Sequence, residues 1–170
     1  MKRVYGSIKT PKIECINRRL NKWRVRCDFA EETTEEGGVR VSFEETEFLH
    51  KPTIEEVKNY VLGVENRKID NLILSGFEWN SMKVWLSSEN QFNYKAAYDL
   101  TVQTNGASLP VTFKFGTTEN PIYYQFDTLE ELSDFYSSAI SYINNILAEG
   151  WEKKDAIDWN EYEVLLNNKY

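Results

Sequence analysis

The chain has few of the residues from which enzymes and metal centres are assembled. Its 170 residues include two cysteines and one histidine. Cys15 and Cys27 lie twelve positions apart without a CxxC pair, and His50 has no second histidine with which to form a metal site or a catalytic triad. Glycine-rich phosphate loops, GxSxG and HExxH are also missing. We therefore expect no enzymatic activity, no cofactor and no bound metal, and we interpret both cysteines as reduced apolar residues.

Long apolar runs are missing as well. No segment approaches the ~20 apolar residues of a membrane-spanning helix. The first residues, Met1 to Gly6, lack the apolar run of a signal peptide. We expect no membrane partner, and we expect the chain to stay in the compartment where it is made.

Aromatic residues, in contrast, are abundant, with five tryptophans, ten tyrosines and nine phenylalanines. Such side chains fill cores, and Trp and Tyr are enriched where subunits meet. Stacking on sugars or bases is a further use, but the acidic chain opposes phosphate backbones, so a nucleic-acid partner is not expected. We predict self-association as a homodimer, with a trimer as the alternative. The interface residues predicted are Trp79, Trp85, Trp151 and Trp159.

Charge is unevenly distributed along the chain. The net charge is −7, yet residues 1–27 hold nine Lys and Arg residues and one Glu, a net charge of +8 that leaves −15 for the remainder. A basic arm on an acidic body indicates docking to an acidic partner. The alternative is a solvated strand face that pairs with the chain's own acidic residues. The docking residues predicted in this arm are Lys2, Arg3, Lys9, Arg18, Arg19, Arg24 and Arg26.

Alternating apolar and polar residues predict the strands. The predicted strand segments are 12–17, 22–30, 39–43, a hairpin at 77–86 and a hairpin at 109–126. Capping boxes predict the helices, because a hydroxyl side chain and a Glu or Gln three residues later can satisfy each other's backbone N–H groups. These boxes begin at Thr53, Ser88 and Thr128.

Glycines predict where the three helices end. The first should run over 54–75 with Gly76 in the left-handed conformation, the second over 89–104 before Asn105–Gly106, and the third from 129 to Gly150. Apolar spacing predicts which side chains these helices bury. The residues expected in the core are Phe92, Ala96, Tyr98 and Leu100 of the second helix, and Phe135 and Ile140 of the third.

These elements predict an α+β fold in which antiparallel hairpins alternate with three helices, in the order ββ-α-ββ-α-ββ-α. A short helical tail follows Asp158. The change of pattern near Lys51–Pro52 suggests a domain boundary. Residues 1–51 would form the basic N-terminal arm and a β-hairpin lobe, and residues 52–170 an α+β domain.

Four sequence motifs within residues 70–158 carry a family resemblance. They are Gly76-Phe77-Glu78-Trp79-Asn80, the run from Val84 to Gln91, the run from Leu109 to Gly116, and Ala148-Glu149-Gly150-Trp151. This half of the chain resembles an uncharacterised domain of tailed phages and prophages, particularly those of Bacteroides-type gut bacteria. The domain is associated with virion-appendage and tail-fibre-related proteins. Its motifs carry no known catalytic residues, so no site residue is transferred.

The resemblance implies a non-enzymatic phage protein made in the cytoplasm of the bacterial host. In the first reading it is a virion structural protein, a head-fibre, collar or tail-appendage subunit that anchors or joins other virion proteins. In the second it is a tail-fibre assembly chaperone that is absent from the mature particle. The basic arm lies outside the resembling segment, and attachment specificity is expected there.

Overall fold

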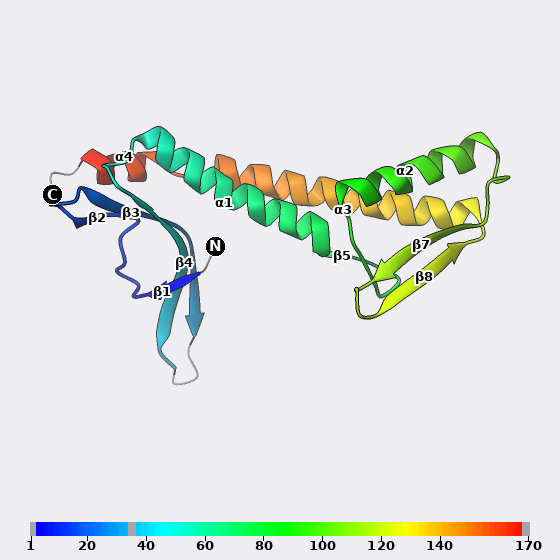
Figure 1. The fold of residues 1–170 in the computed structure, drawn as a ribbon, viewed down its shortest axis with the longest axis horizontal. Coiled ribbons are helices and arrows are strands. Elements are labelled where there is room, and N and C mark those ends of the chain that lie inside the picture. The colour runs from blue at the N-terminus through cyan, green and yellow to red at the C-terminus, as the bar shows by residue number, and fades with distance from the viewer. Residues whose placement is uncertain (1–2, 34–36, 168–170) are drawn as a thin grey trace. The chain divides into compact units, whose positions relative to one another are not determined.

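The computed structural model describes residues 3–33 and 37–167 as antiparallel strands and helices (Figure 1). The predicted α+β class is confirmed, although four strands precede the first helix. None of the described helices combines the length and the apolar character that crossing a membrane requires. The elements are β1 (Val4–Gly6), β2 (Ile13–Asn17), β3 (Lys22–Thr33), β4 (Val39–Phe48), α1 (Ile54–Ser75), β5 (Phe77–Trp79), β6 (Met82–Val84), α2 (Ser88–Gln103), β7 (Val111–Gly116), β8 (Pro121–Phe126), α3 (Leu129–Asp155) and α4 (Trp159–Asn167).

The chain forms two compact units. Unit 1 comprises residues 1–66 and 154–170, and unit 2 comprises residues 67–153. This division differs from the predicted boundary near Lys51–Pro52. The physical reason is that the first turns of α1 bury Val57, Val61 and Val64 in the core of unit 1, so the helix after the proline belongs with the N-terminal strands.

Unit 1 is a four-stranded antiparallel sheet with helices packed on one face. The strand order is β1-β4-β3-β2, and β3 and β4 form a long hairpin (Figure 1). Alternate residues of β3, namely Trp23, Val25 and Cys27, face α1 and α4 and are buried. From α4, Tyr162 and Leu166 complete this core. Both cysteines are free thiols, as predicted.

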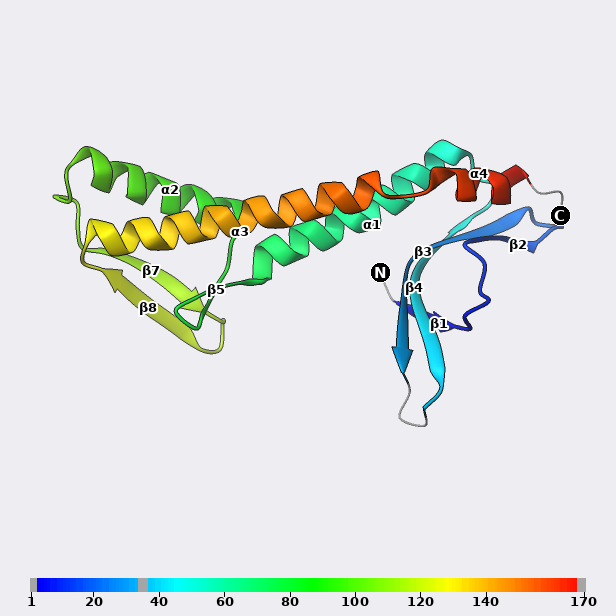
Figure 2. The same cartoon turned by 180° about the vertical axis from the view of Figure 1, so that it is seen from behind.

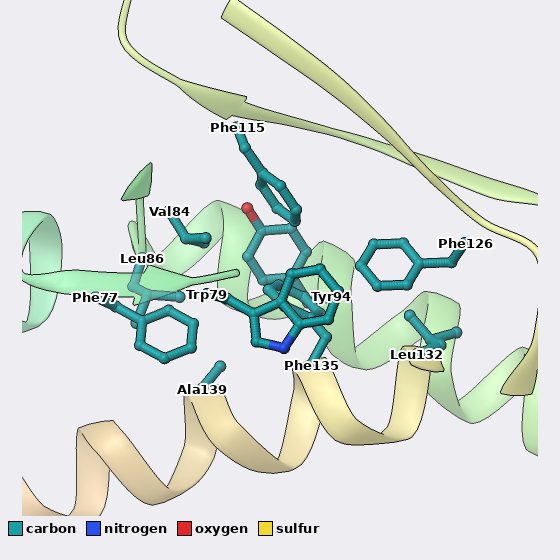
Figure 3. Packing of buried hydrophobic residues seen from close by; sticks show 10 residues of the cluster. All are labelled: Phe77, Trp79, Val84, Leu86, Tyr94, Phe115, Phe126, Leu132, Phe135 and Ala139. Atoms are coloured by element: carbon teal, nitrogen blue, oxygen red, sulfur yellow. The ribbon is translucent and has the colours of Figure 1, made fainter. Parts of the chain in front are cut away.

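Unit 2 packs α2 and α3 against two hairpins, β5–β6 and β7–β8 (Figure 2). Its core is a cluster of aromatic rings around Phe135 of α3, which is fully buried as predicted. Figure 3 shows Trp79, Tyr94 and Phe126 converging on this ring from three different elements. Their ring centroids lie 5.1–5.4 Å from that of Phe135. Such tilted and edge-on contacts stabilise the core beyond simple burial.

The predicted buried face of α2 was largely wrong, since of its four residues Tyr98 packs against the core of unit 2 and the other three are exposed. Phe92 is 71% exposed and Leu100 is 52% exposed, while Tyr94 and Thr101 are buried instead. Thr101 can enter the core because its hydroxyl donates to the carbonyl of Ala97 at 2.8 Å, which satisfies the polar group. In α3, Ile140 is likewise exposed, at 37%, so its predicted burial was also wrong.

Two glycines have roles other than the predicted helix stops. The φ of Gly76 is not positive, and this glycine instead admits Tyr142, whose hydroxyl donates to the carbonyl of Leu72 at 2.8 Å. Gly150 does not end α3, which continues to Asp155. A Cβ on Gly150 would clash with the side chain of Ile69, so close packing between α1 and α3 within unit 2 requires this glycine.

The capping signals were more accurate than the burial pattern. At α1, Thr53 and Glu56 exchange side-chain and backbone hydrogen bonds of 3.2 and 2.8 Å. At α2 the cap is Ser87, one residue before the predicted one, and its hydroxyl accepts from the backbone of Asn90. At α3, Thr128 caps as predicted, but the Glu131 carboxylate accepts from the Tyr124 hydroxyl.

Candidate functional site

Most cations of the basic arm are held by acidic residues of unit 1 itself. Arg26 is the extreme case, because its side chain is 5% exposed. Its Nε donates to Glu45 at 2.9 Å, one Nη donates to the carbonyl of Pro11 at 2.9 Å, and the other donates to Glu14 at 2.5 Å. Arg26 therefore fastens the 7–12 loop and β2 to the sheet, and the prediction that it docks a partner is corrected.

Arg3 and Arg24 are also engaged within unit 1. Arg3 donates to the Asp28 carboxylate at 2.5 Å and to the Asp28 carbonyl at 2.8 Å, which ties β1 to the β3 bulge. Arg24 donates to Glu47 across the β3–β4 pair at 2.6 Å. This hydrogen bond lowers the pKa of Glu47 and raises that of Arg24. For Arg3 and Arg24, the structure thus agrees with the second interpretation of the basic arm, in which its cations pair with acidic residues of the same chain.

Three predicted docking residues remain available. Lys9, Arg18 and Arg19 are exposed, and none of them forms an ion pair with another residue in the described part of the chain. Lys2 lies outside the described residues. Arg18 and Arg19 share the turn between β2 and β3, residues 17–21, which we call the docking turn. Leu20 in this turn is 67% exposed.

Local hydrogen bonds hold the docking turn in place. The Asn17 side chain accepts from the backbone N–H of Leu20 at 3.1 Å. Asn21 adopts φ of 49°, a left-handed conformation that asparagine tolerates, and its side chain accepts from the indole N–H of Trp23 at 2.8 Å. Because Trp23 is buried in the core of unit 1, the turn is anchored and presents two arginines beside an apolar side chain.

The four predicted interface tryptophans lie in different environments. Trp79 is buried in the aromatic core of unit 2, where its indole N–H donates to Asp134 at 3.0 Å, so its predicted place at an interface is corrected. Trp159 is partly buried beside Tyr162 in unit 1, with ring centroids 5.9 Å apart. Trp85 and Trp151 are 50% and 57% exposed. The pattern of tryptophans along the chain could not separate these cases.

The outward face of α2 is an apolar stripe that sequence reasoning assigned to the core. Phe92, Ala96 and Leu100 recur every fourth residue and are exposed, on the side of α2 opposite Tyr94 and Thr101. Lys95 and Asp99 border this stripe and form an ion pair of 2.5 Å, which raises the pKa of Lys95. An exposed apolar stripe on a helix that already fills its own core is typical of an interaction surface.

The single histidine, His50, contacts a carboxylate that caps α1. Nε2 of His50 lies 2.8 Å from a carboxylate oxygen of Glu56, which also closes the capping box of α1. The backbone of Thr53 and the imidazole lower the pKa of Glu56. Across residues 3–33 and 37–167, no group of three or more His, Cys, Asp or Glu side chains is arranged to hold a metal ion.

Comparison of the chain with protein-family models, with curated proteins and with solved structures found no match.

Proposed function

We propose that this chain is a non-enzymatic structural protein of a phage virion, a head-fibre, collar or tail-appendage subunit that docks to another virion protein. The observation that carries the proposal is the docking turn. Its two arginines are exposed and unpaired within the described residues, whereas most other arm cations are already paired. The resemblance of residues 70–158 to a tailed-phage domain supports the virion context.

The chemistry of the turn selects the kind of partner. Arginine forms planar, bidentate pairs with carboxylates. The exposed Leu20, which follows the two arginines in the turn, adds an apolar contact. The partner is therefore a protein with carboxylates around a small apolar patch. A nucleic acid fits less well, because the chain as a whole has a net charge of −7, which repels phosphate backbones.

Mass spectrometry of purified particles tests the virion assignment. Stoichiometric presence of the chain supports a structural role, and absence from particles that require it for assembly would favour the tail-fibre chaperone instead. A double variant, Arg18→Ser with Arg19→Ser, should reduce incorporation into particles. The matched control, Arg67→Ser with Lys153→Ser, removes the same charge from unit 2 and should leave incorporation unchanged.

A second copy of this chain is the partner we propose for the apolar stripe of α2. An antiparallel two-fold pairing centred on Ala96 places Phe92 of each copy against Leu100 of the other, with the small alanine permitting close approach. The same symmetry brings Lys95 of one copy near Asp99 of the other, so the bordering charges are complementary. This arrangement is a homodimer.

Light scattering at micromolar concentration tests the homodimer. Phe92→Ser with Leu100→Ser should yield a monomer. Val164→Ser on α4, which removes a side chain that is 51% exposed, should leave the mass unchanged. A monomeric parent protein would contradict self-association, and a trimer would contradict the two-fold pairing of α2.

A further inference from the structure

Unit 2 carries a surface pocket of about 500 Å³ whose charge differs from that of the rest of the chain. The chain has 27 Asp and Glu residues, but none of the ten residues that line this pocket is acidic and two are lysines. The lining comes from the end of α1, from β6 and the residues after it, from the first turn of α2, and from β7 with its following turn. Glu89 and Glu119 adjoin lining residues in sequence but do not line the pocket.

Trp85 provides an aromatic wall that is fixed in place. It lies between Val84 and Leu86, which are both buried, so alternation turns the indole outward. The Asn90 side chain donates to the carbonyl of Trp85 at 2.7 Å, and the Gln91 side chain donates to the carbonyl of Leu86 at 2.7 Å. These bonds hold the segment before a ligand arrives, which lowers the entropy lost on binding.

Lys83 and Lys114 supply the positive charge of the pocket. Lys83 lies on β6 and Lys114 on β7, two strands that are neighbours in unit 2. Both side chains are exposed, and neither ammonium group forms an ion pair within the described ranges 3–33 and 37–167. Buried Val84 and Phe115 give the pocket an apolar part. The pocket thus joins one indole face to two available cations.

The turn after β7 adds hydroxyl groups in a defined geometry. Gly116 has φ of 79°, and a Cβ at this position would clash with the carbonyl oxygen of Asn120, so only glycine fits. Thr117 donates its backbone N–H to that carbonyl at 3.2 Å, and its hydroxyl accepts from the backbone of Asn120 at 3.1 Å. The Thr117 hydroxyl keeps its proton for donation to a ligand.

We propose that this pocket binds a saccharide that carries a carboxylate, such as a uronic or sialic acid. The apolar face of a pyranose ring stacks on Trp85, Lys83 and Lys114 attract the carboxylate, and Asn90 and Thr117 bond sugar hydroxyls. The volume lies in the range of pockets that hold small ligands, roughly 300–1,000 Å³. A nucleotide is less suited, because the chain's negative charge repels a phosphate dianion more strongly than a carboxylate monoanion.

Titration calorimetry with the full-length protein tests the site. The probes are trigalacturonate and sialyllactose, and the neutral matches are the methyl ester of trigalacturonate and lactose. We expect at least one acidic probe to bind and its neutral match to bind at least tenfold more weakly. The proposal would be overturned if an acidic probe and its neutral match bound with equal affinity, or if neither acidic probe gave a heat of binding. Tighter binding of uridine monophosphate than of either saccharide would also overturn it.

Two matched variants locate the binding in this pocket. Trp85→Ala should weaken binding at least tenfold, while Trp151→Ala, which removes an indole of similar exposure from unit 2, should have no effect. Lys83→Ser with Lys114→Ser should remove the preference for the acid, while Arg67→Ser with Lys153→Ser, which removes two cations of unit 2 that do not line the pocket, should retain it. The site shares no residue with the docking turn or with the α2 stripe, so its failure and that of the proposed function are separate results.

Discussion

Arg26→Met should destabilise unit 1 strongly although it removes a residue that the charge pattern placed on a docking surface. Methionine keeps most of the aliphatic length and deletes the three donors that reach Glu45, Pro11 and Glu14. Removing one partner of a buried ion pair costs about 3–5 kcal/mol. The lower end applies here, because the Glu14 and Glu45 side chains are 33% and 17% exposed and water can partly solvate them. We expect a loss of about 3 kcal/mol.

The measurement is urea unfolding followed by circular dichroism and by tryptophan fluorescence, with separate transitions fitted if the two units unfold apart. The matched control is Arg24→Met, because Arg24 is 28% exposed and its partner Glu47 is 38% exposed. A pair that is this open to water contributes much less to stability than a buried pair. Equal losses for the two variants, or a loss below about 1 kcal/mol for Arg26→Met, would refute the structural role of Arg26.

Further predictions concern packing and pH. Phe135→Ala should lower the free energy of unfolding in urea by about 3–5 kcal/mol, whereas Ile140→Ala should lower it by less than about 1 kcal/mol. A larger loss for Ile140→Ala than for Phe135→Ala would contradict the position of the core around Phe135. Gly150→Ala should cost about 1–3 kcal/mol by thermal unfolding, because its new methyl meets the packed isoleucine of α1. The hydrogen bond from Arg24 lowers the pKa of Glu47. The stability that this ionised carboxylate adds to the fold is therefore present above about pH 4.5 and is lost as the pH falls through the folded-state pKa. Burial raises the pKa of Tyr94 to about 12. In a pH titration followed by tyrosinate absorbance, Tyr94 should therefore ionise at a higher pH than an exposed tyrosine, and the protein should lose stability between pH 10 and about 12.

Local signals in the sequence predicted the elements well because their physics is local. A capping hydroxyl acts on a backbone N–H three residues away, and Asn80–Ser81 turns the β5–β6 hairpin with positive φ at both residues. The α2 face was mispredicted because Phe92 and Leu100 form a more regular apolar pattern than the residues that are buried. Thr101 was overlooked because burial of a hydroxyl depends on a partner that spacing does not reveal.

The candidate sites depend on contacts between distant segments. Counting charges identified the basic arm, but it could not separate Arg26, whose partner Glu45 lies nineteen residues away, from Arg18, which has no such partner in the described chain. The residue type of Trp85 predicts a place at a subunit interface. Its pocket could not be predicted, because the second lysine and the threonine turn reach it only through the packing of β7 beside β6.

Unit 1 is interrupted in the chain by the whole of unit 2, and this arrangement affects the order of folding during synthesis. Tyr162 and Leu166, which complete the core of unit 1, are translated only after residues 67–153. The core of unit 1 is therefore completed only after all of unit 2 has been translated. At ~5–20 residues per second, the part of the sheet that α4 covers stays open for several seconds. A nascent chain halted after residue 153 should expose this apolar surface to chaperones and proteases.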